Sequence, residues 1–367
     1  MNDGVSPADL PNKSRVSPVV CLPRPLSLIH SPTVLPFPRL IIVLSLSAIT
    51  PLARAAVEVK ELPDRVRVEI GGKLFTEFRH GDAPHVYYWP LIGPDGVKVT
   101  RAWPMEEAPG EERDHPHHRS MWFSHGSVNG VDFWGEDASY KGTPKHPVGK
   151  IVFDDKATLT IHQTQAPLGE NDSGGMTTSQ KWIAPDGTVP LTSTQTLRVY
   201  DRPETERLFD FETTLTAGEK EVTFGDTKEG TFGVRIAESM RLKQPKGPGE
   251  GHIVNSEGLR DDKVWGTHAK WVDMSGPIGG KTYGIAIFDH PSNLRHPTRW
   301  HARDYGLFAA NPFCEVEMDK SQPKGSGDYM LPAGKSVTFK YRVLIHQGDP
   351  DTAKLDSQFA EYAKTTP

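Results

Sequence analysis

The sequence is poor in cysteine, in clusters of basic residues and in long apolar runs. Only two cysteines, Cys21 and Cys314, occur among its 367 residues. Cys21 lies in the N-terminal segment that we expect to be removed as a leader. Cys314 would then have no intramolecular disulfide partner, so we expect a hydrophobic core rather than cross-links to hold the fold. After residue 55 no apolar run is long enough to span a bilayer, which argues against integral membrane association.

Several common catalytic motifs are also missing. The chain has no G-x-S-x-G elbow, no Walker loop, no dinucleotide-binding glycine pattern and no H-E-x-x-H. These motifs place nucleophiles, phosphates, cofactors or zinc in many enzymes. Their absence disfavours serine hydrolases, enzymes of nucleoside triphosphates and NAD-dependent enzymes.

The N-terminal segment has the pattern of an export signal. Residues 40–49 form a mainly apolar run, basic residues precede it, and Ala53-Arg54-Ala55 follows as a small-x-small cleavage site. We therefore expect residues 1–55 to be a removable leader and signal peptide, and residues 56–367 to form one periplasmic or extracellular domain. Losing five Lys/Arg and two Asp/Glu with the leader would change the net charge from −5 to −8. Such an acidic chain is a poor match for nucleic acid, whose phosphates need clustered Lys and Arg.

Short alternating runs of apolar and polar residues, separated by Gly, Pro and Asp turns, dominate the rest of the chain. Residues 66–70 and 74–78 alternate in this way, and the pair Gly71-Gly72 between them indicates a hairpin. Further strands are expected at 87–92, 97–100, 151–153, 157–162, 181–183, 189–200, 207–215, 222–224, 231–236, 283–288, 306–310 and 336–346. This spacing predicts an all-β fold, a large antiparallel sandwich of the supersandwich kind.

One short helix is expected at the C-terminus. Leu355, Phe359 and Tyr362 fall at i, i+4 and i+7, which places them on one helical face. Asp351 or Thr352 can cap its first turn. We interpret this helix as a packing element only.

A histidine-rich stretch, DHPHHRSMWFSHGSVNGVDFWGE, is the first candidate for chemistry. Pro116 lacks an N–H, so the stretch is expected to begin as a loop or an edge segment. An extended backbone would put His115, His117 and Arg119 on one face and His118 on the other. Several ionisable groups brought together in this way are typical of a working site.

Two further stretches with candidate functional residues lie at the ends of predicted strands. In KEGTFGVR, Glu229 stands at a strand entry beside a glycine, where a loop can present its carboxylate as a general base or a hydroxyl ligand. FDHPSNLRHPTRWHARD follows the strand that ends at Phe288 and carries histidines, arginines and an asparagine. Functional side chains often lie where loops leave a sheet.

These stretches suggest an acid/base set and a group of substrate ligands. We expect His117 or His125, with Glu229, to transfer protons, because histidine titrates near neutral pH. Arginine, asparagine, histidine and acidic groups can bind sugar hydroxyls, and tryptophan rings can stack on sugar faces. The expected substrate-binding residues are His115, His118, Arg119, Trp122, Asn129, Asp132, Trp134, Arg235, His290, Asn293, His296, Arg299 and Trp300. A single site requires five residues in one pocket: His117, His125, Glu229, His290 and His296.

The blocks HPHHRSMWFSHGSVNGVDFW, KEGTFGVRIAESMR and GIAIFDHPSNLRHPTRWHARDYGLFAANPF resemble a PmoA-like family of exported bacterial proteins, over residues 60–347. That name implies a copper subunit of a membrane enzyme, but without membrane spans we expect no such assembly. The all-β pattern with His, Arg, Asn and Glu on loops is also similar to sugar-binding sandwiches of the galactose-mutarotase type. This second resemblance implies a carbohydrate ligand.

The sequence therefore predicts an exported carbohydrate-binding protein, and we favour an enzyme whose reaction is hydrolysis, lysis or epimerisation. One alternative is a metal protein, with zinc, copper or calcium as the candidate ions. For zinc or copper the candidate ligands are His115, His117 or His118, His125, and His290 or His296. The other alternative is a non-catalytic glycan-binding module.

Overall fold

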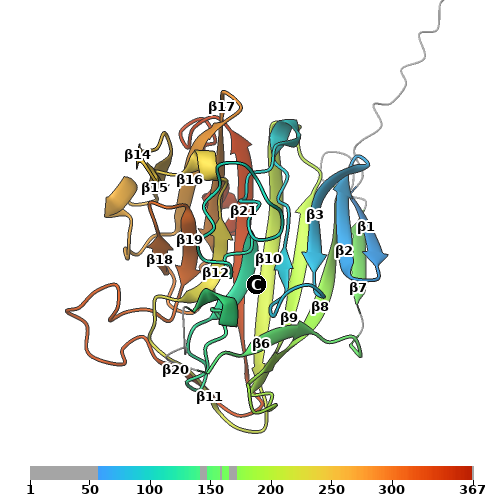
Figure 1. The fold of residues 1–367 in the computed structure, drawn as a ribbon, viewed down its shortest axis with the longest axis vertical. Helices are drawn as coiled ribbons and strands as arrows, with labels where there is room; N and C mark the ends of the chain where they lie inside the picture. The colour runs from blue at the N-terminus through green and yellow to red at the C-terminus, as the bar shows by residue number, and fades with distance from the viewer. Residues whose placement is uncertain (1–56, 141–146, 158, 165–171, 366–367) are drawn as a thin grey trace, which may run out of the picture. The chain divides into compact units, whose positions relative to one another are not determined.

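The computed structural model describes residues 57–140, 147–157, 159–164 and 172–365. Two large antiparallel sheets form the framework of the fold (Figure 1). The antiparallel sandwich and the short C-terminal helix predicted from the sequence are confirmed. The predicted leader and signal peptide, residues 1–55, lies outside the described residues.

The first sheet has eight strands in the order β1-β2-β3-β4-β5-β12-β19-β18. They are β1 (Val57–Leu62), β2 (Arg65–Ile70), β3 (Lys73–Arg79), β4 (Tyr87–Tyr88), β5 (Met121–His125), β12 (Gly230–Arg235), β18 (Arg299–Ala302) and β19 (Leu307–Asn311). β12 pairs with β5 on one side and with β19 on the other. The three blocks singled out in the sequence contain β5, β12 and β18–β19, so this sheet makes them neighbours.

The second sheet has nine strands, in the order β15-β16-β17-β21-β10-β9-β8-β6, with β7 also paired to β8. They are β6 (Lys150–Phe153), β7 (Thr160–Thr164), β8 (Ser173–Ile183), β9 (Leu191–Tyr200), β10 (Glu206–Ala217), β15 (His252–Asn255), β16 (Trp271–Ile278), β17 (Lys281–Asp289) and β21 (Ser336–Gln347). Two small ribbons pair β11 (Val222–Phe224) with β20 (Tyr329–Leu331) and β13 (Lys243–Gln244) with β14 (Gly247–Pro248). Short 3₁₀ turns lie at Pro94–Gly96, Asp137–Ser139, Glu238–Met240 and Asp261–Lys263.

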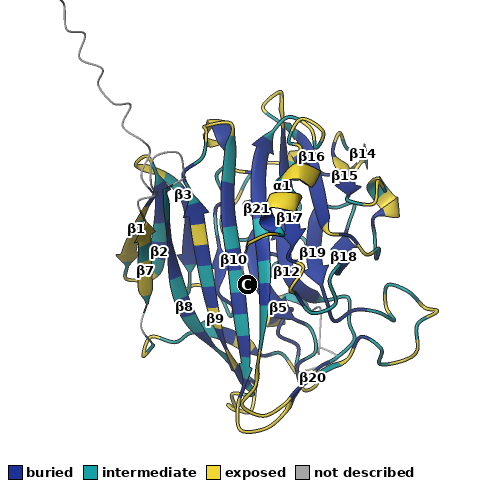
Figure 2. Cartoon of the chain, turned by 180° about the vertical axis from the view of Figure 1, so that it is seen from behind, coloured by how far each residue is buried: buried dark blue, intermediate teal, exposed yellow. Residues whose placement is uncertain are grey.

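The hydrophobic core lies between the two sheets. In β9 the residues from Leu191 to Val199 alternate between buried and less buried positions, because successive side chains point to opposite faces. Phe211 of the second sheet stacks on Phe232 of the first, with ring centroids 4.7 Å apart. Each such ring stabilises the fold by roughly 1.5–3 kcal/mol relative to exposure. Figure 2 shows β17 and β19 as mostly buried, whereas β10 alternates between buried and intermediate residues and many turn residues are exposed.

The predicted strands match the observed strands best where one face of the strand is buried and the other is not. Gly71 and Gly72 form the predicted hairpin turn, with φ values of 58° and 72° that suit glycine. The predicted strand at 97–100 is wrong, since this segment makes only isolated bridges. β16 was not predicted, because its first six residues are all buried and show no alternation. β1, β5, β13, β14, β15, β18 and β20 were also not predicted.

The C-terminal helix α1 (Leu355–Tyr362) packs on the side of the second sheet that faces away from the core. Leu355 and Tyr362 join a buried cluster with residues of β10, β16, β17 and β21. The predicted capping is wrong: Lys354 occupies the N-cap position, with φ at 52° and no side-chain cap. Within the described part of the chain, no helix has both the length and the apolar character needed to cross a membrane.

Candidate functional site

A pocket of about 480 Å³ lies on the face of the first sheet that points away from the core. The loops before and after β5, the loop before β12 and the turn between β18 and β19 form its walls. Its lining residues are His115, His117, His118, Asp132, Trp134, Gly135, Ser139, Tyr140, Lys228, Glu229, His301, Arg303 and Tyr305. All three sequence blocks therefore contribute to it.

The strand register places two small residues between larger ones in the sheet beside the pocket. Trp122, Gly233, Ala309 and His301 form one row across β5, β12, β19 and β18. The two small residues in the middle of the row leave space between the larger ones. A Cβ on Gly233 would lie 2.9 Å from the Trp122 ring and 3.1 Å from the Trp134 ring. Glycine at this position therefore lets both indoles lie close against β12.

A stack of aromatic and imidazole rings forms one wall of the pocket. Tyr305 and His115 are parallel, with ring centroids 5.2 Å apart, and His115 and His118 are parallel at 4.7 Å. His118 in turn stacks on Trp122 at 5.3 Å. The segment is a turn, in which the His118 N–H donates to the His115 carbonyl. The predicted extended alternation is therefore wrong, and His115, His117 and His118 all line the pocket.

Two buried arginines and one aspartate support this turn from below. Arg101 and Arg235 both donate hydrogen bonds to the carboxylate of Asp114. Arg101 also donates to the main-chain carbonyls of Asp114 and His115. Burial opposes ionisation of Asp114, but the hydrogen bond with His115 and the charges of Arg235 and Arg101 outweigh burial and lower its pKa. This charged network holds the histidine turn against the sheet.

His118 is a neutral imidazole of defined tautomer. The Arg235 guanidinium lies 3.3 Å from its Nδ1, so Nδ1 accepts and Nε2 carries the proton. Burial, followed by the neighbouring charges, lowers the pKa of His118 well below its usual value. We therefore expect His118 to act in the pocket as a neutral hydrogen-bond donor.

His117 is also neutral. Its Nδ1 lies 2.7 Å from the Ser139 hydroxyl, and the Ser139 oxygen accepts the main-chain N–H of Glu136. Burial lowers the pKa of His117 to about 3, with smaller contributions from nearby His115 and His85. Its Nε2 has no hydrogen-bond partner among the described residues. This nitrogen is therefore available to a ligand.

Tyr140 is held by Asp132. The tyrosine hydroxyl donates to Oδ2 of Asp132, and the main-chain N–H groups of Trp134 and Gly135 donate to Oδ1 at 2.8 and 2.9 Å. Burial, together with the adjacent Asp132 carboxylate, raises the pKa of Tyr140. A Cβ on Gly135 would lie 2.5 Å from the Tyr140 hydroxyl, so glycine permits this close approach. Tyr140 is thus a fixed, protonated hydroxyl at the pocket wall.

Lys228 forms hydrogen bonds with both Glu229 and His301, and all three residues line the pocket. The Lys228 ammonium donates to Oε1 of Glu229 at 2.6 Å, and the Lys228 carbonyl accepts Nδ1–H of His301 at 2.8 Å. His301 therefore carries its proton on Nδ1, and its buried Nε2 is an unpartnered acceptor within the described structure. Burial, assisted by the positive charge of Arg303, lowers the pKa of His301 to about 3.

The prediction that one pocket unites five residues is correct for His117 and Glu229 and wrong for the others. His125 lies on β5, contacts the rings of Phe224 and Phe313 and does not line the pocket. Its Nε2–H donates to the Gly225 carbonyl at 2.8 Å, and burial lowers its pKa to about 4. Its position is that of a core histidine.

His290, Asn293 and His296 belong to a different network. Asn293 exchanges two hydrogen bonds with the main chain of Lys340 on β21, and His296 binds the buried Asp289 at 2.8 Å. His290 bonds with Ser292 and contacts the ring of Tyr362 on the helix. These side chains attach a loop to the second sheet. Their nearness in sequence to His301 and Arg303 does not bring them to the pocket.

Four of the other predicted ligands line the pocket: Asp132, Trp134, His115 and His118. Other predicted ligands form contacts that stabilise the fold. Arg119 forms a two-point ion pair with Glu136, and Arg235 is buried beneath the histidine turn. Asn129 accepts the Thr223 N–H at a turn.

Burial also changes the predicted role of the tryptophans. Trp122 and Trp134 are each 2% exposed, and Trp300 is fully buried with its N–H on the Ala269 carbonyl. A sugar could not stack on the Trp300 ring, so its prediction as a platform is wrong. Arg299, next to it, pairs with Glu315 at 2.7 Å.

Sequence reasoning gave no role to several residues that shape the pocket. They are Asp114, Ser139, Tyr140, Lys228, His301, Arg303 and Tyr305. For two of them a signal existed: His301 and Arg303 alternate with the apolar Trp300 and Ala302, and an extended chain turns alternate side chains to opposite faces of a sheet. Tyr140 stands in no recognisable pattern, and only the fold brings it to the pocket.

The structure also bears on the predicted metal site. Among the residues that the structure describes, no group of three or more His, Cys, Asp or Glu side chains is arranged to hold a metal ion. The candidate zinc or copper ligands are divided, since His125, His290 and His296 lie away from the pocket that contains His115, His117 and His118.

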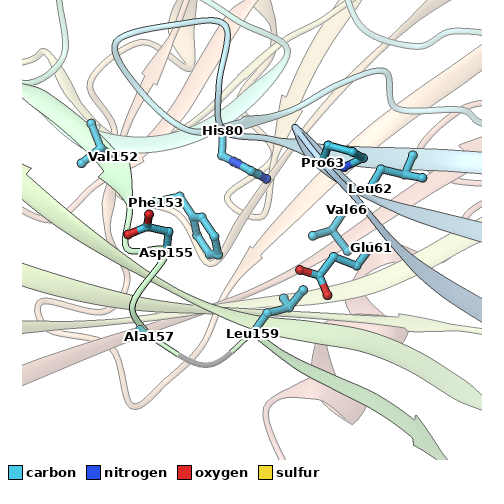
Figure 3. Close-up of a pocket in the computed structure, with 10 residues that line it drawn as sticks. All are labelled: Glu61, Leu62, Pro63, Val66, His80, Val152, Phe153, Asp155, Ala157 and Leu159. Carbon is cyan, nitrogen blue, oxygen red and sulfur yellow. The ribbon is translucent and has the colours of Figure 1, made fainter.

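A larger pocket of about 700 Å³ lies between the β1–β2 hairpin and β6 (Figure 3). Among the described residues that line it, the ionisable ones are Glu61, His80 and Asp155, and the His80 ring packs on Phe153 at 4.7 Å. No residue of the three blocks reaches it, so the pocket beside β12 is the candidate site.

The chain belongs to a family of unknown function, DUF6807, whose sequence profile matches residues 65–360. This range includes all three blocks and every residue of the pocket. No curated protein matches the sequence.

Solved structures of carbohydrate-active enzymes show similarity at a low level. An alpha-galactosidase from Lactobacillus brevis is 9% identical, with 83% of this chain and 41% of that chain covered and a TM-score of 0.38. A glycoside hydrolase family 97 enzyme from Pseudoalteromonas sp. strain K8, in complex with panose, is 10% identical, with 81% and 35% covered and a TM-score of 0.32. A polysaccharide lyase is 13% identical, with 81% and 33% covered and a TM-score of 0.27. The chain thus spans well under half the length of these proteins, and their chemistry carries no argument about its site.

Proposed function

We propose that this protein is an exported carbohydrate-binding protein that acts on its sugar ligand by acid/base chemistry. The observation that carries this proposal is that His117 and Glu229 line one pocket together with the hydroxyls of Ser139, Tyr140 and Tyr305. Imidazole, carboxylate and hydroxyl groups all form hydrogen bonds with hydroxyls, which suits a ligand rich in them. A volume of about 480 Å³ lies within the usual range for small-molecule sites.

The two proton-transfer candidates have different parts in this proposal. At pH 7 an imidazole with a pKa of about 3 is protonated in only about one molecule in 10⁴. His117 is therefore a neutral hydrogen-bonding group rather than a general acid. Glu229 takes the proton-transfer role, because Oε2 has no hydrogen-bond partner among the described residues while Oε1 is held by Lys228.

The neutral groups around Glu229 would orient the sugar. Tyr140 presents a hydroxyl fixed by Asp132, and His118 presents a fixed Nε2–H. His301 offers the opposite polarity, an acceptor nitrogen. Donors and acceptors held in place in this way reduce the entropy lost when a flexible, hydroxylated ligand binds. Export rests on the signal-peptide pattern of residues 1–55, and the PmoA-like resemblance rests on the three sequence blocks.

A glycan screen with product analysis tests the proposal. The wild-type protein, Glu229→Gln, His117→Ala and a control, His252→Ala, would be compared by calorimetry and by chromatography of the products. His252 is an exposed histidine outside the pocket, so its variant should match the wild type. We expect Glu229→Gln to bind glycan but to lose turnover by about 10²–10⁴-fold, the usual contribution of acid/base groups.

Three outcomes would contradict the proposal. Wild-type protein that binds no glycan removes the carbohydrate function. Binding without any product, together with unchanged affinity in both pocket variants, supports a non-catalytic module that binds elsewhere. Activity that is lost when metal is removed from untagged protein, and restored by zinc or copper, supports the metal alternative.

A further inference from the structure

We infer that the pocket selects an acidic carbohydrate, one with a carboxylate such as a uronic acid, and that Arg303 binds this carboxylate. This inference rests on the proposed carbohydrate function and specifies its substrate class. Arginine suits the task because its planar, permanently charged guanidinium matches a carboxylate with two parallel hydrogen bonds.

Arg303 differs from the other arginines around the pocket. Arg101 and Arg235 bind Asp114, Arg119 binds Glu136, and Arg299 binds Glu315. Within the described structure, by contrast, the guanidinium of Arg303 forms no hydrogen bond and no ion pair. It is only partly buried and lines the pocket, so a ligand can reach it.

Two aromatic rings hold this free arginine in place. Its guanidinium carbon lies 5.0 Å from the ring centroid of Trp265 and 5.2 Å from that of Tyr305. Cation–π contacts at these distances restrict the side chain and leave its N–H groups unused. A charge that is oriented before binding loses less conformational entropy when a ligand arrives.

The charges around Arg303 favour an anion in the pocket. The negative charge of Glu229 is compensated by Lys228, which lies 2.6 Å away. Both carboxylate oxygens of Asp132 already accept hydrogen bonds, from Tyr140 and from two main-chain N–H groups. The buried histidines His117, His118 and His301 have lowered pKa values and are uncharged at neutral pH. Arg303 is therefore the cationic side chain of the pocket lining that has no acidic partner, within the described residues.

A second pocket indicates on which side of Arg303 the carboxylate would lie. This pocket, of about 310 Å³, shares Arg303 and contains Trp265, Asp262 and Asp304. Asp304 lies 3.7 Å from Lys243, but Asp262 has no cationic partner among the described residues and would repel an anion, whereas Glu229 of the first pocket is paired with Lys228. The carboxylate therefore belongs in the pocket of Glu229, and the second pocket has room for a neighbouring sugar unit.

Matched pairs of oligosaccharides test this inference. Uronate oligosaccharides of several linkage types would be compared with the same compounds after carboxyl reduction, which turns each carboxylate into a neutral alcohol. Binding would be measured by calorimetry for the wild type, Arg303→Gln, Arg303→Lys and the control Arg198→Gln. Arg198 is exposed on β9 of the other sheet, so its variant makes the same charge change away from the pocket.

We expect the wild type to bind at least one acidic form about 10- to 100-fold more tightly than its reduced partner, the range for charge-assisted hydrogen bonds. Arg303→Gln should bring this ratio close to one, Arg303→Lys should give an intermediate ratio, and Arg198→Gln should leave it unchanged. Equal or tighter binding of the reduced forms by the wild type, or an unchanged ratio in a folded Arg303→Gln protein, would overturn the inference while the carbohydrate function stands. Failure to bind any member of any pair, and any neutral glycan, would overturn the proposed function itself.

Discussion

Replacing Asp114 with asparagine should destabilise the protein and disturb the histidine turn. Asp114 is the shared carboxylate partner of Arg101 and Arg235, whose side chains are fully buried, while Asp114 itself is 29% exposed. Removing one partner of a buried ion pair costs about 3–5 kcal/mol, because the remaining charge stays buried without compensation. The partial exposure of Asp114 places the expected loss near the lower end, at about 3 kcal/mol.

The loss can be expressed as a change in melting temperature. An unfolding entropy of roughly 2.1 cal/mol/K per residue gives about 0.6 kcal/mol/K for a domain of about 300 residues. A loss of about 3 kcal/mol would then lower the midpoint by about 5 °C. Calorimetry at pH 7 would measure this shift. The control is Asp64→Asn, because Asp64 pairs with Arg65 at the surface and such pairs contribute about 0–1 kcal/mol.

The pH dependence gives an independent check on the same interaction. The pKa of Asp114 is lowered in the folded protein, so its contribution is complete above the unfolded pKa, near 3.9, and is lost as the pH falls through the folded value. The difference between the wild type and Asp114→Asn should therefore be larger at pH 7 than at pH 3. If Asp114→Asn loses no more stability than Asp64→Asn, or if the difference grows toward low pH, this account of the network is refuted.

Three further predictions concern Gly233, a buried ion pair and export. Gly233→Ala should lower stability by about 1–3 kcal/mol in urea unfolding and weaken glycan binding, because its Cβ would lie 2.9 Å from Trp122 and 3.1 Å from Trp134, which lines the pocket; unchanged affinity would contradict this packing. Burial opposes the charge on His346, but Asp273, 2.9 Å away, outweighs burial and raises its pKa. The wild type should therefore lose stability relative to His346→Gln as the pH rises above about 6.5, and a constant difference from pH 5 to 9 would argue against this pair. Sequencing of protein exported by a bacterial host should find a new N-terminus after residue 55, whereas an intact leader would refute the predicted signal peptide.

The sequence predicts much of the fold because half-buried strands record their burial in every second residue. The hairpin around Gly71 and the long strand β9 follow this rule, and both were predicted. β16 does not follow it, since one of its faces meets the core and the other the cluster around α1. A strand buried on both faces has no alternation from which it can be recognised.

The sequence by itself determined which residue types are present and which local structures they form. It identified His117, Glu229 and the three blocks, because histidines, carboxylates and glycines were concentrated at predicted strand ends. Only the tertiary structure decided which of these side chains meet. The register of β5, β12, β19 and β18 turns His301 toward the pocket, while His125 and His290 turn to other contacts. The physical reason is that cross-strand neighbours are set by pairing between segments that can be far apart in the sequence, such as Trp122 and Gly233, which no local pattern encodes.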